Sequence, residues 1–246
     1  MRMHVISSGS KGNASLIYDN STTILVDMGI SLKRLIEGLN EINKDIDDID
    51  FCLFTHEHSD HIKGASFIDK GLYFSRLGTI ELKKGHNLEI FKKYHFGDID
   101  VTPLLTSHDA IAPCGFLFEE NNEKLVYLTD TGYIPEVTLD CIHNCDYYFI
   151  ESNYDEKMLF ESSRPIFLKQ RIAGEMGHLS NEQSATYMSE LIGGKTKAIM
   201  LAHLSEECNK PEIALDTYKK VFKEKKVSFK QVKCICAHQW SSSDLC

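Results

Sequence analysis

Short apolar runs bounded by turn residues recur along the chain and predict a series of buried strands. In the first half of the chain these runs occupy residues 3–7, 14–18, 22–26, 51–54, 72–74 and 99–101. In the second half they occupy residues 116–118, 124–130, 146–150 and 198–202. Runs of this length, rich in β-branched and aromatic residues, are typical of strands. Glycine and asparagine turns separate several of them, which favours hairpins.

Apolar stripes with helical spacing lie between these strands. One stripe covers residues 32–39 behind Ser31, a good N-cap residue. Ser180 to Gln183 forms a capping box ahead of a second stripe, and Pro211 opens the last one. A lysine-rich helical segment is also expected between the strands at 72–74 and 99–101. Alternating strands and helices predict an α/β protein.

A cluster of polar side chains follows the predicted strand at residues 51–54. In an extended segment side chains alternate between faces, so His56 and His58 point the same way. A helix that begins near Asp60 would bend the chain and bring His61 to the same place. Neutral imidazole and carboxylate are ligands that suit zinc, manganese or iron, so the loop is a candidate metal site. A histidine-rich surface loop is the alternative.

The string His56-Glu57-His58-Ser59-Asp60-His61 matches the HxHxDH signature, and the chain therefore resembles the metallo-β-lactamase superfamily. Members of this superfamily have further ligands downstream, each at the end of a strand. Here His108, Asp130 and His203 each follow an apolar run of the β type. The resemblance implies an α/β, metallo-β-lactamase-type four-layered αβ/βα sandwich, and we expect a single domain over residues 1–246.

Four further strings narrow the resemblance to the WalJ/YycJ branch of that superfamily. They are Ser8-Gly9-Ser10-Lys11-Gly12-Asn13, Glu151-Ser152-Asn153, Gly177-His178-Leu179-Ser180-Asn181 and Leu201-Ala202-His203-Leu204-Ser205. The glycine-rich string is a turn that resembles the rim of the active site in that branch; a plain hairpin loop is the alternative. Histidine is usual in that branch where this chain has Tyr154, so the departure puts any role of position 154 in doubt.

The resemblance implies two divalent metal ions per chain, zinc, manganese or iron, that share one aspartate. The ligands would be His56, His58 and His108 for one ion, Asp60, His61 and His203 for the other, and Asp130 as the bridge. Each set leaves open positions, so a hydroxide that bridges the ions is the expected nucleophile. Asp27 occupies the superfamily's first acidic motif, whose usual part is to hold the metal loop by hydrogen bonds.

Three residues are candidates for proton transfer. Asp60 can orient or deprotonate the attacking water while it acts as a ligand. His178 is the candidate that protonates the leaving oxygen, because the related tRNA-processing branch has a histidine in a comparable string; a structural histidine ahead of the helix is the alternative. Glu151 can set the tautomer of His178.

The resemblance implies a nuclease, with 5′-to-3′ DNA exonuclease activity as the expected task and DNA as the partner. A bridging aspartate in place of a thiolate favours the hydrolase and nuclease branches over β-lactam cleavage. The same fold also serves small-molecule phosphodiesterases and thioesterases, and a non-catalytic, metal-loaded regulatory protein is a further alternative.

Composition changes this picture little. The 246 residues are 42% hydrophobic and 26% charged, which is ordinary for a globular protein. The expected location is cytoplasmic, since no apolar run could cross a bilayer and no signal peptide is visible. The eight cysteines are expected to be reduced thiols, and the pairs at 141/145 and 234/236 lack the CxxC motifs of a second metal site.

The distribution of charge and the remaining histidines allow two further predictions. The formal net charge is −9, yet residues 210–233 hold eight lysines and three acidic residues, a surplus of five positive charges. A solvated helix face and a track for nucleic acid are the two readings of that patch. The histidines without a ligand context are expected on the surface; they are His4, His86, His95, His143 and His238.

Overall fold

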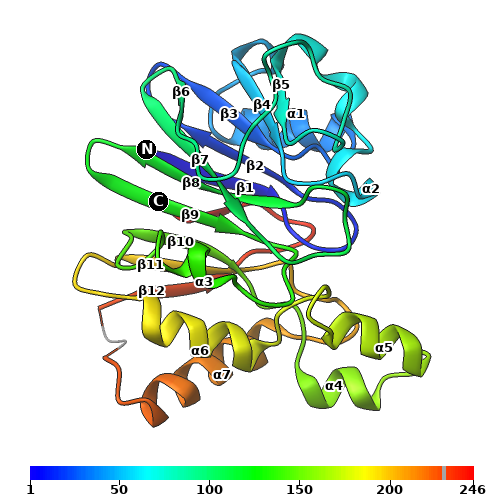
Figure 1. Ribbon diagram of the computed structural model, residues 1–246, viewed down its shortest axis with the longest axis vertical. Helices are drawn as coiled ribbons and strands as arrows, with labels where there is room; N and C mark the ends of the chain where they lie inside the picture. The colour runs from blue at the N-terminus through cyan, green and yellow to red at the C-terminus, as the bar shows by residue number, and fades with distance from the viewer. Residues whose placement is uncertain (229–230) are drawn as a thin grey trace.

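The protein is described by a computed structural model that covers residues 1–228 and 231–246. Two sheets form its centre (Figure 1). The first sheet has the order β13-β1-β2-β3-β4-β5. Its strands are β1 (Arg2–Ser7), β2 (Ala14–Tyr18), β3 (Thr23–Val26), β4 (Phe51–Phe54), β5 (Tyr73–Ser75) and β13 (Ser243–Asp244). Pairing is antiparallel from β13 to β3 and parallel from β3 to β5.

The second sheet has the order β12-β11-β10-β9-β8-β7-β6. Its strands are β6 (Tyr94–Phe96), β7 (Ile99–Leu105), β8 (Cys114–Glu120), β9 (Glu123–Leu128), β10 (Tyr147–Glu151), β11 (Ala198–Ala202) and β12 (Lys233–Cys236). The strands from β6 to β9 form antiparallel hairpins, and β9, β10, β11 and β12 are parallel. The predicted turn between β8 and β9 is present, and its Asn121 and Asn122 have positive φ.

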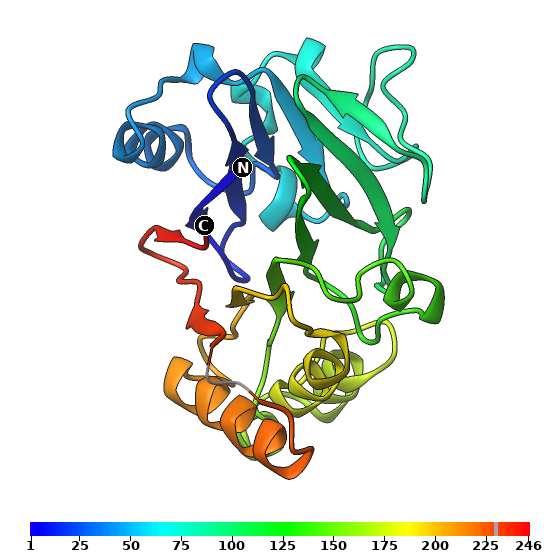
Figure 2. The ribbon, with the colours of Figure 1, turned by 90° about the vertical axis from the view of Figure 1, so that its left-hand side faces the viewer.

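Helices cover the outer faces of the two sheets (Figures 1 and 2). The α-helices are α1 (Leu32–Glu41), α2 (Ser59–Ile62), α3 (Glu136–Leu139), α4 (Glu156–Glu161), α5 (Ile166–Ala173), α6 (Asn181–Leu191) and α7 (Pro211–Glu224). Short 3-10 turns are η1 (Ile46–Asp48), η2 (Ala65–Phe67) and η3 (Lys70–Leu72). In the part of the chain that the structure describes, every helix is too short or too polar to cross a bilayer.

Three apolar clusters hold the layers together. The central cluster lies between the sheets and contains Leu53 of β4 and Phe149 of β10. A second cluster packs α6 and α7 against the second sheet, and a third packs α1 against the first sheet through Leu35. The order helix, sheet, sheet, helix confirms the predicted four-layered αβ/βα sandwich.

Two local predictions are corrected by the structure. The lysine-rich stretch between β5 and β6 is not helical but consists of turns and irregular chain. Gly78 and Gly85 adopt φ values of 100° and 91° there, which a right-handed helix does not contain. The helices α4 and α5, which follow β10, were not predicted. Because both helices are weakly amphipathic or very short, the spacing of their apolar residues does not indicate a helix.

Candidate active site

The ends of three strands meet at one edge of the sandwich, each followed by an acidic or imidazole side chain. Asp27 follows β3, Asp130 follows β9 and His203 follows β11. All three have positive φ, at 59°, 55° and 55°. Such a conformation costs a non-glycine residue roughly 1–3 kcal/mol, so the fold holds these side chains in place against a local preference. Strain of this kind is typical of functional sites.

The loop between β4 and α2 is anchored by Asp27, which is fully buried. Its carboxylate accepts hydrogen bonds from Thr55 N at 2.8 Å and from His61 Nδ1 at 2.8 Å. Gly29 lies so close to the loop that an added Cβ would come within 1.5 Å of the Asp60 carbonyl oxygen. Asp27 and Gly29 therefore fix the position of the histidine loop, as the first acidic motif predicted for Asp27.

The structure brings together all the residues that the sequence singled out as metal ligands. Potential ligand atoms within 4.8 Å of one another occur in the groups His56/His58/His108, His56/His61/Asp130, Asp60/His61/His203 and Asp130/Glu151/His178/His203. Asp130 lies between the two predicted sets, with Oδ2 at 3.3 Å from His61 Nε2 and Oδ1 at 3.7 Å from His108 Nε2. This is the placement expected of a shared ligand.

The imidazoles are oriented by hydrogen bonds at their Nδ1 atoms. His108 Nδ1 donates to the Gly177 carbonyl at 3.0 Å, and His203 Nδ1 donates to Glu151 Oε1 at 2.8 Å. The hydroxyl of Thr55 donates to Asp27, so at 3.0 Å it can accept from His56 Nδ1. A proton on Nδ1 leaves the Nε2 lone pair free, which is the arrangement of metal-bound histidines.

Several buried atoms at the site make no hydrogen bond. They are His56 Nε2, His203 Nε2 and Asp130 Oδ2. Buried polar atoms are nearly always paired, so unpaired acceptors within such close groups indicate a place that a cation would fit. The donor set of imidazoles and carboxylates fits a divalent metal ion.

Burial favours the neutral, metal-binding form of two of the histidine ligands, His56 and His108. Burial lowers the pKa of His56 well below its usual value, and His61 lowers it further. Burial also lowers the pKa of His108. The pKa of Asp130 falls well below its usual value, because His203 and His61 outweigh the opposing effect of burial. Burial opposes protonation of His61 and His203, but Asp27 and Asp130 raise the pKa of His61 to about 10, and Asp130 raises the pKa of His203 well above its usual value. A metal ion must therefore displace a proton from these two imidazoles.

Glu151 is the centre of a hydrogen-bond network behind the ligands. It is fully buried, and its Oε1 accepts from His178 Nδ1 at 2.9 Å as well as from His203. Its Oε2 accepts from the backbone of Thr131 at 3.0 Å and of Leu179 at 3.1 Å. Burial alone would raise the pKa of Glu151, but His178 and His203 lower it to about 2. Glu151 is therefore an ionised carboxylate that orients two histidines, of which the sequence predicted only His178.

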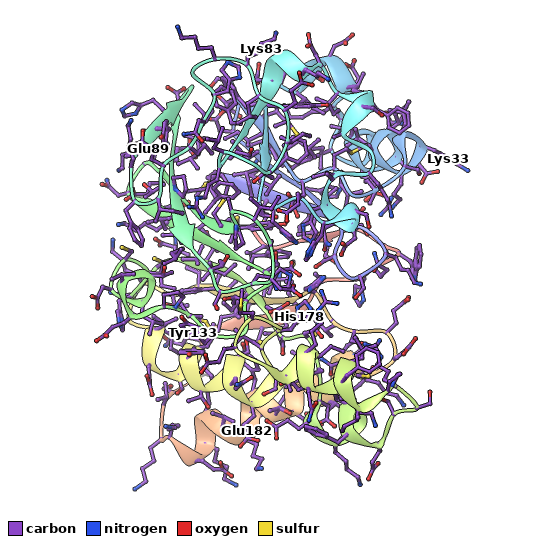
Figure 3. All side chains as sticks on the ribbon, turned by 45° about the vertical axis from the view of Figure 1, so that its right-hand side comes forward. Lys33, Lys83, Glu89, Tyr133, His178 and Glu182 are labelled. Carbon is purple, nitrogen blue, oxygen red and sulfur yellow. The ribbon has the colours of Figure 1, made fainter. Side chains whose placement is uncertain are left out.

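His178 lies at the junction of the two halves of the molecule, whereas Lys33 and Lys83 lie at its periphery (Figure 3). The Nδ1 atom of His178 is hydrogen-bonded to Glu151, and the residue lines a cavity of about 190 Å³. The cavity is lined by Ser10, His58, Asp60, His108, Asp109, Asp130, Arg171, Ile172, Gly177, His178 and His203. Five of the seven proposed ligands and the proposed acid therefore line one space that a reacting group can enter, whereas His56 and His61 lie outside that lining.

Two residues at the site were missed. Arg171 of α5 lines the cavity and binds Asp109 Oδ2 through Nε at 2.6 Å. No sequence motif marks it, because it reaches the site only through the fold of α5. Asn13 lies in the glycine-rich string, and its Nδ2 is 3.1 Å from His61 Nε2.

Other expectations fall outside the cavity. Tyr154 is buried against Leu159 and Cys208 beneath α4 and α5, where it packs as a core residue. Of the lysine patch, Lys219, Lys220 and Lys223 lie on α7, which runs away from the site edge (Figure 1). Lys219 is paired with Asp216 at 2.8 Å. Lys230, counted in that patch, lies outside the described residues. The cysteines are all free thiols, and the groups that could hold a metal contain none of them within residues 1–228 and 231–246.

The expectation for the remaining histidines is wrong for His4. It is 3% exposed and its Nδ1 donates to Asp244 at 2.7 Å. The partner lies on β13, the strand that closes the first sheet at the far end of the chain. His95 is exposed, as expected.

Comparisons with known proteins agree with the geometry. The model of the beta-lactamase superfamily domain matches residues 22–203. The chain is 39% identical over 225 residues to the exodeoxyribonuclease WalJ of Streptococcus pneumoniae, covering 85% of this chain and 84% of the relative. It is 34% identical over 238 residues to the exodeoxyribonuclease YycJ of Bacillus anthracis, covering 92% and 90%. Among solved structures, the metallo-beta-lactamase fold protein YhfI of Bacillus subtilis is similar in fold, with a TM-score of 0.71, 16% identity and coverage of 98% and 99%.

Proposed function

This chain belongs to the beta-lactamase superfamily, and from that premise we propose that it is a metal-dependent phosphodiesterase that degrades DNA from the 5′ end. One observation carries the proposal. The potential ligand atoms lie close together beside one cavity, in a chain that resembles two named exodeoxyribonucleases over most of its length. A DNA substrate also fits the expected cytoplasmic location, which is part of the proposal.

We assign two divalent ions to the site, held by the residues that the sequence predicted. One set is His56, His58 and His108, the other is Asp60, His61 and His203, and Asp130 is shared. Zinc, manganese and iron are the candidate metals. When bound, such ions supply a water of lowered pKa and positive charge for the oxygens of a phosphate.

The residues of the chain divide the proton transfers between them. Asp60 orients the attacking water and takes its proton as the water oxygen bonds to phosphorus. The bond from phosphorus to the leaving oxygen then breaks, and His178 gives that oxygen a proton from Nε2. Since Nδ1 already donates to Glu151, His178 must carry both protons to act as the acid. The Glu151 carboxylate stabilises that imidazolium, and proton uptake from solvent restores it.

The cavity also offers a contact for the substrate's phosphate. Arg171 is the one arginine or lysine among the residues that line it, and its side chain is 59% exposed. Its guanidinium is paired with Asp109 Oδ2, and a phosphate oxygen is an equivalent partner for the same planar fork. We therefore assign Arg171 to binding of a backbone phosphate beside the cleaved bond.

The test is cleavage of DNA labelled at the 5′ or the 3′ end. The purified chain is incubated with single- and double-stranded DNA after addition of zinc, manganese or iron, each separately. Stepwise loss from the 5′ end is expected with at least one metal. Asp130→Ala should abolish cleavage, because it removes the carboxylate between the two ligand sets.

A matched control separates this loss from general damage. Asp140→Ala makes the same chemical change at an exposed position at the end of α3, and cleavage should continue. Loss from the 3′ end would overturn the assigned polarity. Activity on small chromogenic esters with none on DNA would move the assignment to a small-molecule phosphodiesterase or thioesterase. Binding of metal without hydrolysis of any ester would favour the non-catalytic alternative.

A further inference from the structure

A second cavity of about 430 Å³ lies on the other side of the glycine-rich turn. Its volume is within the roughly 300–1,000 Å³ that small-molecule sites occupy. The segment 237–241, the start of α7 and the segment 204–206 supply most of its wall. Nothing in the proposed reaction uses this space, although it adjoins the active site.

Both cavities are lined in part by the glycine-rich turn. Ser8 lines the second cavity, and its hydroxyl accepts a hydrogen bond from the backbone of His203 at 2.9 Å. Ser10, two residues later, lines the first cavity. Gln239 ties the turn to the C-terminal segment, because its Nε2 donates to the Gly12 carbonyl at 3.0 Å. A strand of substrate that leaves the active site across this turn would reach the second cavity directly.

Trp240 is an exposed aromatic ring at this cavity. It is the single tryptophan of the chain, and 70% of its surface is exposed. The indole Nε1 donates to Glu206 Oε1 at 2.5 Å, which holds the ring in a defined orientation. An exposed, oriented ring of this kind is the stacking platform that proteins use for the bases of single-stranded nucleic acids.

The charges at the cavity decide which part of a nucleotide enters it. Glu206 and Glu212 are acidic and would repel a phosphate group, whereas a neutral base meets no such barrier. Lys210 is the single lysine or arginine in the lining, and it is exposed at the cavity's edge. The base therefore enters and stacks, while the phosphate remains outside near Lys210.

We propose that this second cavity is a nucleobase-binding subsite, in which Trp240 stacks on a base of the DNA strand next to the cleaved nucleotide. The inference rests on the proposed function, since it extends the substrate contacts of the same site. It adds a contact that is independent of the metal ligands, so it can be measured without cleavage.

Intrinsic fluorescence provides the first test, because Trp240 is the only source of tryptophan emission. The metal-free protein is titrated with single-stranded oligonucleotides, and stacking should quench the emission. Affinity is then measured with fluorescently labelled DNA for wild type, Trp240→Phe and Trp240→Ala. Loss of one stacked base weakens binding roughly 5- to 150-fold, so the alanine variant should fall in that range. The phenylalanine variant should lie between the two, since its ring still stacks.

Phe160→Ala is the matched control, because this aromatic ring on α4 is 54% exposed and lines neither cavity. It should bind DNA as the wild type does. Cleavage of DNA by the wild type, with unquenched emission and unchanged affinity in Trp240→Ala, would overturn the subsite alone. Quenching by DNA without cleavage under any metal would keep the subsite and overturn the proposed enzyme. Absence of both would overturn both.

Discussion

Replacement of Glu151 by glutamine is a sharp test of the network behind the ligands. The carboxylate is fully buried, and each of its oxygens accepts at least two hydrogen bonds. An amide replaces one acceptor oxygen with an NH₂ group that can only donate. If this group faces the backbone, the N–H groups of Thr131 and Leu179 lose their acceptor. If it faces the histidines, His178 and His203 lose theirs.

The loss of stability follows from these contacts. An unsatisfied buried donor costs roughly 1–3 kcal/mol, so two of them cost about 2–6 kcal/mol. For a protein of this size each kcal/mol lowers Tm by roughly 2–4 °C, and Glu151→Gln should therefore lower Tm by about 4–24 °C. Thermal unfolding of the metal-free protein measures this change.

A second readout separates orientation of the ligands from stability. With the NH₂ group facing it, His203 can keep a hydrogen bond only if its proton moves from Nδ1 to Nε2. That move removes the lone pair that points into the site, so metal affinity or activity should fall roughly 10- to 100-fold. Glu190→Gln is the matched control, because Glu190 is exposed and its ion pair with Lys225, at 3.9 Å, is a surface contact worth about 0–1 kcal/mol. Unchanged metal affinity and cleavage in Glu151→Gln would refute this account of the network.

Three further outcomes are expected. A metal ion present at 100 times its Kd adds about 2.7 kcal/mol to the free energy of unfolding. Removal of the metal by a chelator should therefore lower Tm by roughly 5–11 °C in calorimetry, and an unaltered Tm would contradict metal binding. Asp27→Asn disturbs the hydrogen bonds to Thr55 and His61, and competition with a metal indicator should show affinity lowered roughly 10- to 100-fold; equal affinity would count against its anchoring part. Arg171→Gln should weaken DNA binding and reduce by about 1 the slope of the logarithm of the binding constant against the logarithm of salt concentration. Arg171→Lys should keep that slope, and an equal slope in both variants would exclude the phosphate contact.

Local patterns were sufficient to predict the part of the site that strand ends create. His108, Asp130 and His203 each follow an apolar run, and the three strands concerned, β7, β9 and β11, run in the same direction, which brings their ends to one edge of the sheet. The capping box at Ser180 also formed as predicted, since its bonds join residues only three positions apart. The single-domain organisation and the roles of the individual site residues stay predictions.

Contacts between distant segments could not be predicted in the same way. The bond from Glu151 to His203 joins residues 52 positions apart, and the bond from His4 to Asp244 joins residues 240 positions apart. Neither residue type nor spacing encodes which of these positions meet. The positions of Arg171 and Trp240 at cavities could not be predicted either, because each lies in a segment without a motif and reaches its cavity only through the fold.

The most direct measurement is the rate of DNA cleavage against equivalents of metal added to the stripped protein. With two ligand sets that share Asp130, the rate should rise to a plateau at two equivalents per chain, and Asp130→Ala should show no cleavage at any ratio. Full cleavage by the metal-free protein, or a plateau at one equivalent, would contradict the two-ion site.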